Sequence, residues 1–181
     1  MKSYQFILQV LFAVFISSLL SGCSGPLNAA SKIGQVIMDP NIPVGKLDER
    51  PSTLSLTFLS EKDINENEEG EASPIQVQIV YLTEDSKLLE SYYEQFSESK
   101  LDEILGKNYL DHQDYTIKPG DYKVIPDITL DEKNRYLGVI AYYSEPEKSQ
   151  WRSVIKLDGK GHNYHVLVHL RRLEVEMMEY E

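Results

Sequence analysis

The sequence predicts a mainly β protein: a two-sheet antiparallel sandwich with a small two-helix insertion. Three observations support this prediction. Apolar residues recur at every second position in several short segments, which is typical of half-buried strands. Turn signals that contain proline or glycine separate these segments. One stretch, at about 84–106, changes to the spacing of a helix.

Two predicted strands begin the domain, at 53–58 and 75–81. In the first strand, apolar residues share one face and small polar residues share the other. The same alternation follows Pro74 in the second strand. The side chains that we expect to fill the core are Leu54, Leu56, Phe58, Ile75, Val77, Ile79 and Trp151.

The insertion is predicted to hold two helices. Apolar residues from Leu88 to Phe96 fall at helical spacing, after Thr83 and Asp85 as possible caps. A shorter helix begins at Leu101 and ends at a glycine. The strands expected after it cover 115–117, 122–125, 135–144, 150–157 and 164–175.

Composition excludes several classes of protein. The chain has 181 residues, 18 Lys+Arg against 29 Asp+Glu, and a formal net charge of −11. Such a surface repels phosphate backbones, so we expect no nucleic-acid partner. A hydrophobic content of 41% argues against disorder over the whole chain. With Cys23 as its one cysteine, the chain can form neither an internal disulfide nor a four-cysteine metal site.

The first 22 residues are typical of a secretory leader. An apolar run at 6–20 is too short for a membrane span, which needs about 20 residues. It is followed by Leu20-Ser21-Gly22-Cys23, which resembles the lipobox of bacterial lipoprotein signal peptides. The resemblance implies a signal peptide at 1–22, acylation of Cys23, and delivery to the outer membrane because Ser24 follows the cysteine. An ordinary signal peptide or an uncleaved anchor is the alternative.

The predicted domain organisation follows from this leader. A linker at 23–52 contains several prolines and separates the lipid from a folded domain at 53–181. Three acyl chains exceed the two signals needed for stable anchoring, at ~0.8 kcal/mol per buried methylene.

Candidate catalytic residues are few, so we expect no enzyme, no cofactor and no metal. His165 and His169 share a face of a predicted strand, but four residues separate them by ~13 Å, too far for one metal ion. With His162, they are interpreted as solvent-facing imidazoles. Neither a phosphate-binding loop nor a Gly-x-Ser-x-Gly elbow is present in the sequence.

The loop at 60–73 is the candidate binding surface. It has six acids against one lysine, and Ile64 is its one large apolar residue. Loops of more than about 12 residues without secondary structure are usually functional or disordered. From the residues alone, a binding loop and a tolerated, solvated insertion remain equal alternatives.

The order of motifs is similar to that of the TssJ family, the outer-membrane lipoproteins of type VI secretion. The lipobox, the polar loop with Asn65, the segment 74–82, Ile117-Lys118-Pro119-Gly120, the segment 136–143 and Trp151-Arg152 carry the resemblance. It implies a transthyretin-like sandwich without catalysis. It also implies binding to the periplasmic C-terminal domain of a TssM-like inner-membrane protein, and through it an indirect link to TssL.

The resemblance places the partner contact in the loop between the first two strands. The expected partner-binding residues are Ile64, Asn65, Glu66, Asn67, Glu68, Glu69, Gly70 and Glu71. Their glutamates suit a basic patch on the partner, which raises the association rate more than the affinity. The expected function is therefore a non-catalytic, periplasm-facing scaffold at the outer membrane. The alternative is a lipoprotein that binds a lipid or other apolar ligand within its β-structure.

Overall fold

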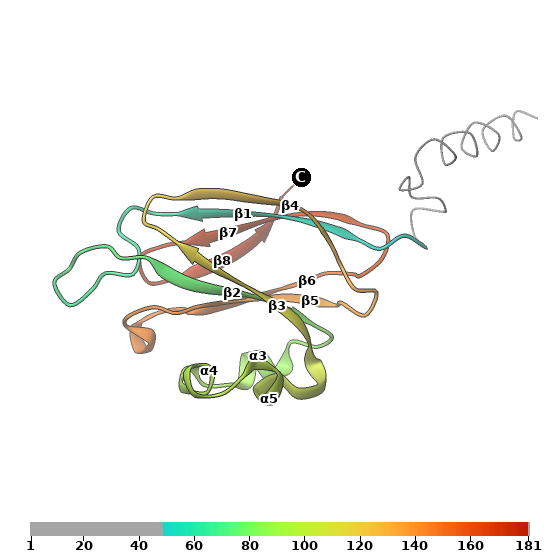
Figure 1. The fold of residues 1–181 in the computed structure, drawn as a ribbon, viewed down its shortest axis with the longest axis horizontal. Coiled ribbons are helices and arrows are strands. Elements are labelled where there is room, and N and C mark those ends of the chain that lie inside the picture. The colour runs from blue at the N-terminus through green and yellow to red at the C-terminus, as the bar shows by residue number, and fades with distance from the viewer. Residues whose placement is uncertain (1–48, 181) are drawn as a thin grey trace, which may run out of the picture. The chain divides into compact units, whose positions relative to one another are not determined.

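The computed structural model describes residues 49–180, in which two four-stranded sheets pack face to face (Figure 1). The first sheet has the order β4-β1-β7-β8, and the second has the order β3-β2-β5-β6. The predicted signal peptide, Cys23 and most of the predicted linker lie outside the described residues. The strands are β1 (Thr53–Ser60), β2 (Ile75–Leu82), β3 (Tyr109–Ile117), β4 (Tyr122–Thr129), β5 (Tyr136–Ala141), β6 (Arg152–Lys156), β7 (Asn163–Leu170) and β8 (Val175–Glu179).

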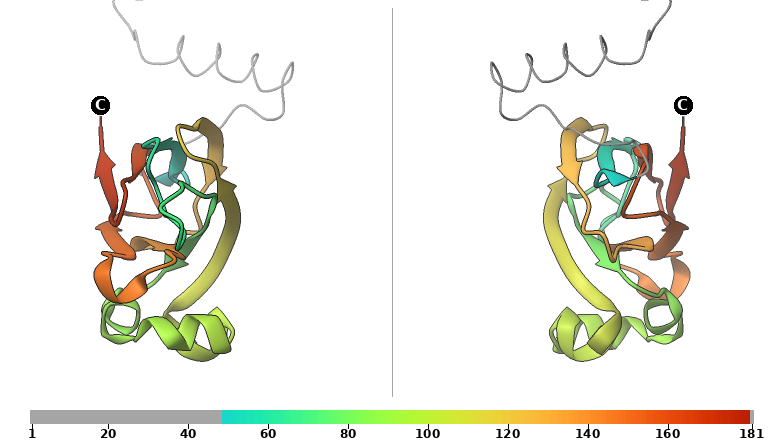
Figure 2. Two further views of the ribbon diagram at one scale, coloured as in Figure 1. Left: turned by 90° about the vertical axis from the view of Figure 1, so that its left-hand side faces the viewer. Right: turned by 90° about the vertical axis from the view of Figure 1, so that its right-hand side faces the viewer.

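The core lies between the sheets and follows the predicted alternation. Leu54, Leu56 and Phe58 of β1 are fully buried and face the second sheet. Alternate residues of β2, from Ile75 to Ile79, meet them from the other side. The prediction of a β-sandwich is therefore confirmed, and both layers are visible edge-on in Figure 2.

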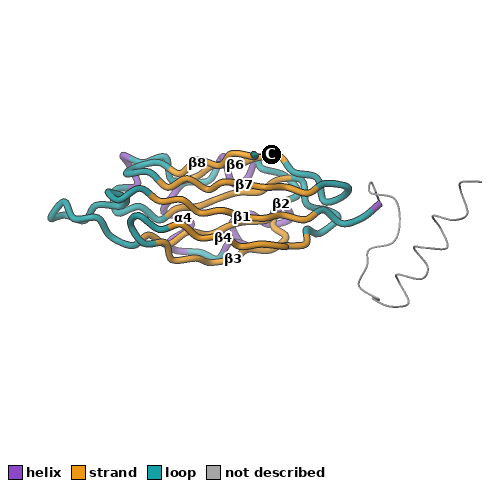
Figure 3. Tube along the Cα trace, turned by 90° about the horizontal axis from the view of Figure 1, so that it is seen from above, coloured by secondary structure: helices purple, strands orange, loops and turns teal. Residues whose placement is uncertain are grey.

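One strand pair departs from the predicted antiparallel arrangement. β1 pairs with β4 in antiparallel fashion on one side, but with β7 in parallel on the other. The parallel register runs without a break from Thr53 opposite Asn163 to Ser60 opposite Leu170. Figure 3 shows β1 between β4 and β7. The sequence does not reveal this pairing because more than 100 residues separate the two strands.

A helical layer covers the outer face of the second sheet. It contains α3 (Ser86–Glu90), α4 (Tyr93–Glu98) and α5 (Leu101–Leu105), followed by a 3₁₀ turn, η2 (Gly106–Asn108). These are three short helices where two were expected. The layer lies below β2, β5 and β6 in Figure 1. The residues that form this second core are Val80, Leu82, Leu88, Phe96, Leu101, Leu105 and Ile140.

The predicted first helix is interrupted by two extended residues. Ser91 ends α3 with its hydroxyl donating to the Lys87 carbonyl at 2.6 Å, and the Tyr92 amide donates to the Gln95 side chain at 2.8 Å. The break turns two residues of the helical pattern outward: Leu89 is 46% exposed and Tyr92 is 75% exposed. Helical periodicity alone cannot show such a break.

The bounds of several strands and the burial of Trp151 also differ from the predictions: β4 extends to Thr129 rather than 125, and β5 ends at Ala141 rather than 144. β3 begins at Tyr109, six residues before the predicted start at 115. The sequence did not indicate these residues because β3 is an edge strand, and its first half is polar without a clear alternation. The segment predicted as one strand over 164–175 is β7 and β8, joined by a tight turn at Arg171. Trp151 is only partly buried and packs against the Phe96 ring of the helical layer, with centroids 5.6 Å apart.

Candidate functional site

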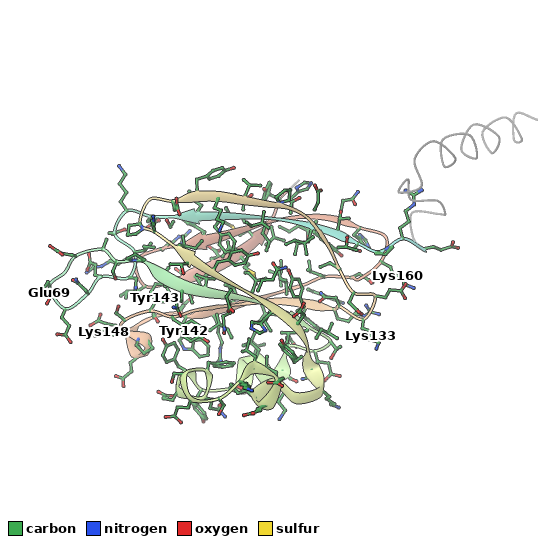
Figure 4. All side chains as sticks on the ribbon, in the orientation of Figure 1. Glu69, Lys133, Tyr142, Tyr143, Lys148 and Lys160 are labelled. Atoms are coloured by element: carbon green, nitrogen blue, oxygen red, sulfur yellow. The ribbon has the colours of Figure 1, made fainter. Side chains whose placement is uncertain are left out.

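Four strand connections meet at one end of the sandwich, and the β1–β2 loop projects beyond the others (Figures 1 and 3). The other three connections join β3 to β4, β5 to β6, and β7 to β8. In Figure 4, Glu69 marks the tip of the β1–β2 loop, and Lys133 and Lys160 mark the opposite end of the sandwich. β1 enters from that opposite end, so the loop lies far from where the described chain begins.

The first residues of the loop belong to the interior of the protein. Ile64 is fully buried in the main core, and Asn65 is only 6% exposed. We call these two residues the loop root. Ile64, the one large apolar residue of this polar loop, packs with the sandwich core, so the loop is not solvated over its whole length. Neither root residue offers its side chain to a partner in this structure.

Asn65 ties the loop root to the β5–β6 connection. Its side-chain oxygen accepts hydrogen bonds from the Ser144 amide at 2.7 Å and the Ser144 hydroxyl at 2.9 Å. Its side-chain nitrogen donates to the Pro74 carbonyl at 3.0 Å and to the Ser73 hydroxyl at 3.3 Å. Ser73 in turn donates to the Asn65 carbonyl. The Asn65 amide also donates to the Arg172 carbonyl at 3.3 Å.

The backbone of Asn65 explains why an asparagine stands at this position. Its φ is 49°, in the left-handed region that asparagine tolerates better than most residues. One residue therefore bends the chain and closes the base of the loop with its side chain. The sequence offered one signal for this role: an asparagine directly after the only large apolar residue of a polar run.

The loop tip is an ordered small hairpin. Glu66 and Ala72 form an isolated antiparallel bridge at its base. The side-chain oxygen of Asn67 accepts hydrogen bonds from the Glu69 amide at 3.1 Å and the Glu71 amide at 2.8 Å. Gly70 has a φ of 78°, which a residue with a side chain adopts only with strain. We call Glu68–Glu71 the loop tip.

Charge at this loop is unevenly distributed. Glu66 is paired with Arg172, whose Nε and Nη2 atoms donate to its carboxylate at 3.0 and 2.5 Å. Glu68, Glu69 and Glu71 are exposed, and within residues 49–180 none of them forms an ion pair. The tip therefore exposes three unneutralised carboxylates to solvent, whereas Glu66, next to the loop root, is neutralised by Arg172.

The β5–β6 and β7–β8 connections brace the loop root. The Tyr143 hydroxyl is nearly fully buried and donates to the Arg171 carbonyl at 3.0 Å. Burial, followed by the charge of Glu174, raises the pKa of Tyr143 far above its ordinary value. Because the hydroxyl stays protonated at neutral pH, it remains a hydrogen-bond donor there. This hydrogen bond joins the β5–β6 connection to the β7–β8 connection, and the Asn65 side chain and amide bind one residue of each.

The three histidines are spread along β7 and the turn before it. His162 stacks on Tyr164, and the Nε2 atom of His169 lies 3.5 Å from the Glu61 carboxylate. His165 is exposed on the outer face and lies beside Tyr180. In the described part of the chain, no three His, Cys, Asp or Glu residues form a group that could hold a metal ion. No helix among residues 49–180 is long and apolar enough to cross a membrane.

A hollow of about 580 Å³ lies on the outer face of the second sheet beside α4. Three of its polar side chains form a chain of hydrogen bonds: the Tyr142 hydroxyl donates to Gln78 at 2.6 Å, and Gln78 donates to Asp114 at 2.9 Å. Burial, aided by Tyr93 and Asp114, raises the pKa of Tyr142 to about 12. The Tyr142 hydroxyl therefore stays protonated at neutral pH and keeps its hydrogen bond to Gln78.

Comparison with solved structures supports the fold. The crystal structure of the type VI secretion lipoprotein TssJ1 from Pseudomonas aeruginosa is 21% identical with a TM-score of 0.67, covering 72% of this chain and 98% of that one. Lip from Serratia marcescens, titled a membrane-bound component of the type VI secretion system, is 20% identical with a TM-score of 0.61, covering 72% and 99%. A chain of the structure titled "T6SS protein TssM C-terminal domain (869-1107) from EAEC" is 21% identical with a TM-score of 0.59, covering 70% and 100%.

The family assignment rests on the sequence. A search of the curated proteins finds no significant match. The family model described as "Type VI secretion lipoprotein, VasD, EvfM, TssJ" matches residues 52–173, which is most of the described chain. This match confirms the resemblance noted in the sequence. The chain therefore belongs to the type VI secretion lipoprotein family that includes TssJ, and it is a component of the type VI secretion membrane complex.

Proposed function

We propose that this protein is a non-catalytic scaffold that fixes the type VI secretion membrane complex to the outer membrane. Acylated Cys23 holds the protein in the membrane, and the loop tip, Glu68–Glu71, binds the periplasmic C-terminal domain of a TssM-like protein. TssL is reached only through that partner. The single observation that carries the proposal is the ordered acidic hairpin at the end of the sandwich opposite the start of β1.

The arrangement of the domain suits a role between two attachment points. β1 is 8 residues long, so at about 3.3 Å for each of the steps between them its two ends lie about 23 Å apart. The chain enters at one end, and the loop tip projects from the other. Tension between a lipid and a partner would therefore run along β1, which pairs with a strand on both sides.

The charge of the loop tip indicates the chemistry of the partner's surface. Three exposed carboxylates within four residues attract a cluster of Lys and Arg side chains. Because these carboxylates are exposed, their attraction is screened by salt and mainly accelerates the encounter. The preformed hairpin lowers the ordering cost of binding. The expected contact is therefore narrower than Ile64–Glu71, since the root side chains are buried.

The proposed anchor depends on residues outside the described part. The residues between Cys23 and the first strand could reach at most ~100 Å when extended, or ~30 Å as a coil. Such a tether lets the domain stand clear of the lipid headgroups, facing the periplasm. The family supports membrane association, and the lipobox in the sequence supports the outer membrane.

The experiment compares three forms of the full-length protein in cells. Cys23→Ser removes the acylation site, and a tip-neutral variant (Glu68→Ser, Glu69→Ser, Glu71→Ser) removes the exposed charges. A helix-neutral variant (Glu84→Ser, Glu90→Ser, Glu98→Ser) is the matched control, because it removes three exposed glutamates from the helical insertion. Membrane fractionation reports anchoring, and co-purification of the TssM-like protein reports binding.

We expect Cys23→Ser to leave the outer-membrane fraction and the tip-neutral variant to remain in it. The tip-neutral variant should lose the TssM-like protein, and the helix-neutral variant should keep it. Outer-membrane retention and continued secretion with Cys23→Ser would contradict the anchoring role. The alternative, an apolar ligand within the sandwich, gains no support, because Leu54, Leu56 and Phe58 fill the interior.

A further inference from the structure

A second cavity, of about 330 Å³, lies at the side of the sandwich where β3 and β4 are the edge strands. It is separate from the β1–β2 loop. Its walls come from β2, β3, β4 and the connection between β4 and β5. Figure 1 shows β3 crossing diagonally over this side, from the helical layer toward the first sheet.

The floor of this cavity is polar and buried. Tyr81 on β2 is 7% exposed, Asn134 is fully buried, and both side chains line the cavity. Neither the Tyr81 hydroxyl nor the Asn134 side-chain oxygen has a hydrogen-bond partner within the described residues. An unpaired buried polar group costs about 1–3 kcal/mol. Both oxygens are therefore left with the capacity to accept a hydrogen bond.

Tyr143 is a useful comparison, because it is at least as buried as Tyr81 but its hydroxyl is hydrogen-bonded. It is 2% exposed, yet its hydroxyl is paired with the Arg171 carbonyl at 3.0 Å. Tyr142 is likewise paired with Gln78. Within the described residues, Tyr81 is thus the buried tyrosine whose hydroxyl has no hydrogen-bond partner, and this residue lines the cavity.

The mouth of the cavity is acidic. Asp111 on β3 and Asp131 after β4 line it, and both residues are exposed to solvent. Within residues 49–180 neither carboxylate forms an ion pair. The positive charge of Arg135, which follows Asn134 in the chain, is paired with Asp158 at 3.5 Å. The mouth therefore keeps its negative charge.

We propose that this cavity binds a cation with N–H donors, a primary ammonium or a guanidinium group. The acidic mouth attracts the positive charge, and the N–H groups donate to the Asn134 oxygen and to the Tyr81 oxygen on the floor. Apolar Leu110, Ile128 and Leu130 line the same cavity and suit the methylene stem of such a ligand. This site lies beyond the loop function proposed above and does not depend on it.

The experiment uses the chain without residues 1–22 and with Cys23→Ser, labelled for NMR. The probes are butylammonium and its neutral analogue butanol, followed through the side-chain amide signal of Asn134 and the ring signals of Tyr81. Butylammonium should bind saturably, and butanol should cause no saturable shift. Tyr81→Phe and Asp111→Asn should each weaken butylammonium binding by about tenfold. Equal binding of the two probes, or unchanged binding in both variants, would overturn the proposal.

A second readout is independent of any probe. Tyr81→Phe removes an unpaired hydroxyl, so it should leave the melting temperature unchanged or raise it. Tyr143→Phe removes a hydroxyl that is hydrogen-bonded to the Arg171 carbonyl, so it should lower the melting temperature. A fall with Tyr81→Phe as large as that with Tyr143→Phe would mean that the hydroxyl is already satisfied, which would contradict the proposal.

The cation has two natural sources, a free amine or a Lys or Arg side chain of a protein partner. Adding the TssM-like periplasmic domain to the butylammonium complex separates them. Displacement of butylammonium would assign the site to a partner side chain, and undisturbed binding would assign it to a free amine. A failed loop-tip experiment would leave both readouts of this site unaffected.

Discussion

The root and the tip of the β1–β2 loop lie only a few residues apart, yet they differ in burial and in what holds them. Ile64 and Asn65 are almost completely buried and contact the core and Ser144. Glu68 and Glu69 are exposed, and the Glu69 amide donates a hydrogen bond to Asn67 within the same loop. A polar loop composition therefore does not mean that the whole loop is surface.

The difference also separates stability from binding. Substitutions at the root should change the free energy of unfolding, and substitutions at the tip should change binding alone. A replacement of the whole range from Asn65 to Glu71 would remove Asn65 and its four side-chain hydrogen bonds. If such a variant failed to bind, the result could not distinguish a loss of folding from the loss of a binding contact.

The largest effect should come from Ile64→Ala. It deletes a fully buried side chain from the main core, so we expect a loss of about 2–4 kcal/mol in the free energy of unfolding. Urea denaturation followed by circular dichroism would measure it. Glu69→Ala is the control at the exposed tip and should change stability by less than about 0.5 kcal/mol. Similar values for both variants would erase the distinction between root and tip.

Asn65→Ala should cost about 1–3 kcal/mol, because it leaves the Ser144 amide without its partner and places alanine at a φ of 49°. Asn65→Gly relieves the backbone strain but not the missing hydrogen bonds. The glycine variant should therefore recover only part of the loss in the same denaturation experiment. Full recovery would mean that backbone conformation, and not the hydrogen bonds, fixes the loop root.

Gly70→Ala should cost about 1 kcal/mol, through backbone strain alone. Its φ is 78°, and a Cβ atom there would meet nothing within 4 Å. Differential scanning calorimetry would show a small decrease in melting temperature. Because the hairpin at the tip is part of the proposed contact, binding to the partner should weaken as well. A large loss of stability would show that the tip is coupled to the core.

The smallest effect is expected from the ion pair between Glu66 and Arg172. Both side chains reach solvent, so Arg172→Gln should cost less than about 1 kcal/mol. The cost should shrink further when salt is added, which a melting series at two ionic strengths would show. A cost that does not depend on salt would indicate that Arg172 acts through packing.

Much of the fold could be predicted from the sequence, since alternation in β1 and the first half of β2 directly reflects a buried face. The second half of β2 is apolar on both faces, because Val80 and Leu82 meet the helical layer while Tyr81 faces the first sheet. The sequence shows that the alternation stops at Val80, but the reason, a second layer packed on the outer face of β2, is a tertiary contact. The break at Ser91 and the parallel pairing of β1 with β7 leave no periodic signal.

The candidate site was predictable in position but not in detail. A long acidic loop between two strands is evident from composition, and the family resemblance gave it a role. The burial of Asn65 depends on Ser144, which lies 79 positions away in the sequence. The cavity floor likewise joins Tyr81 and Asn134 from distant segments. Contacts of this kind become visible only when the chain has folded.

The most direct test of the central claim is a titration of the purified TssM-like C-terminal domain against three proteins. These are the wild type, the tip-neutral variant and the helix-neutral variant, each with its melting temperature measured first. We expect all three to melt alike, the helix-neutral variant to bind like the wild type, and the tip-neutral variant to associate more slowly, by about tenfold or more at low salt. The difference should narrow as salt is added. Undiminished binding by a fully folded tip-neutral variant would contradict the assignment of the partner contact to Glu68–Glu71.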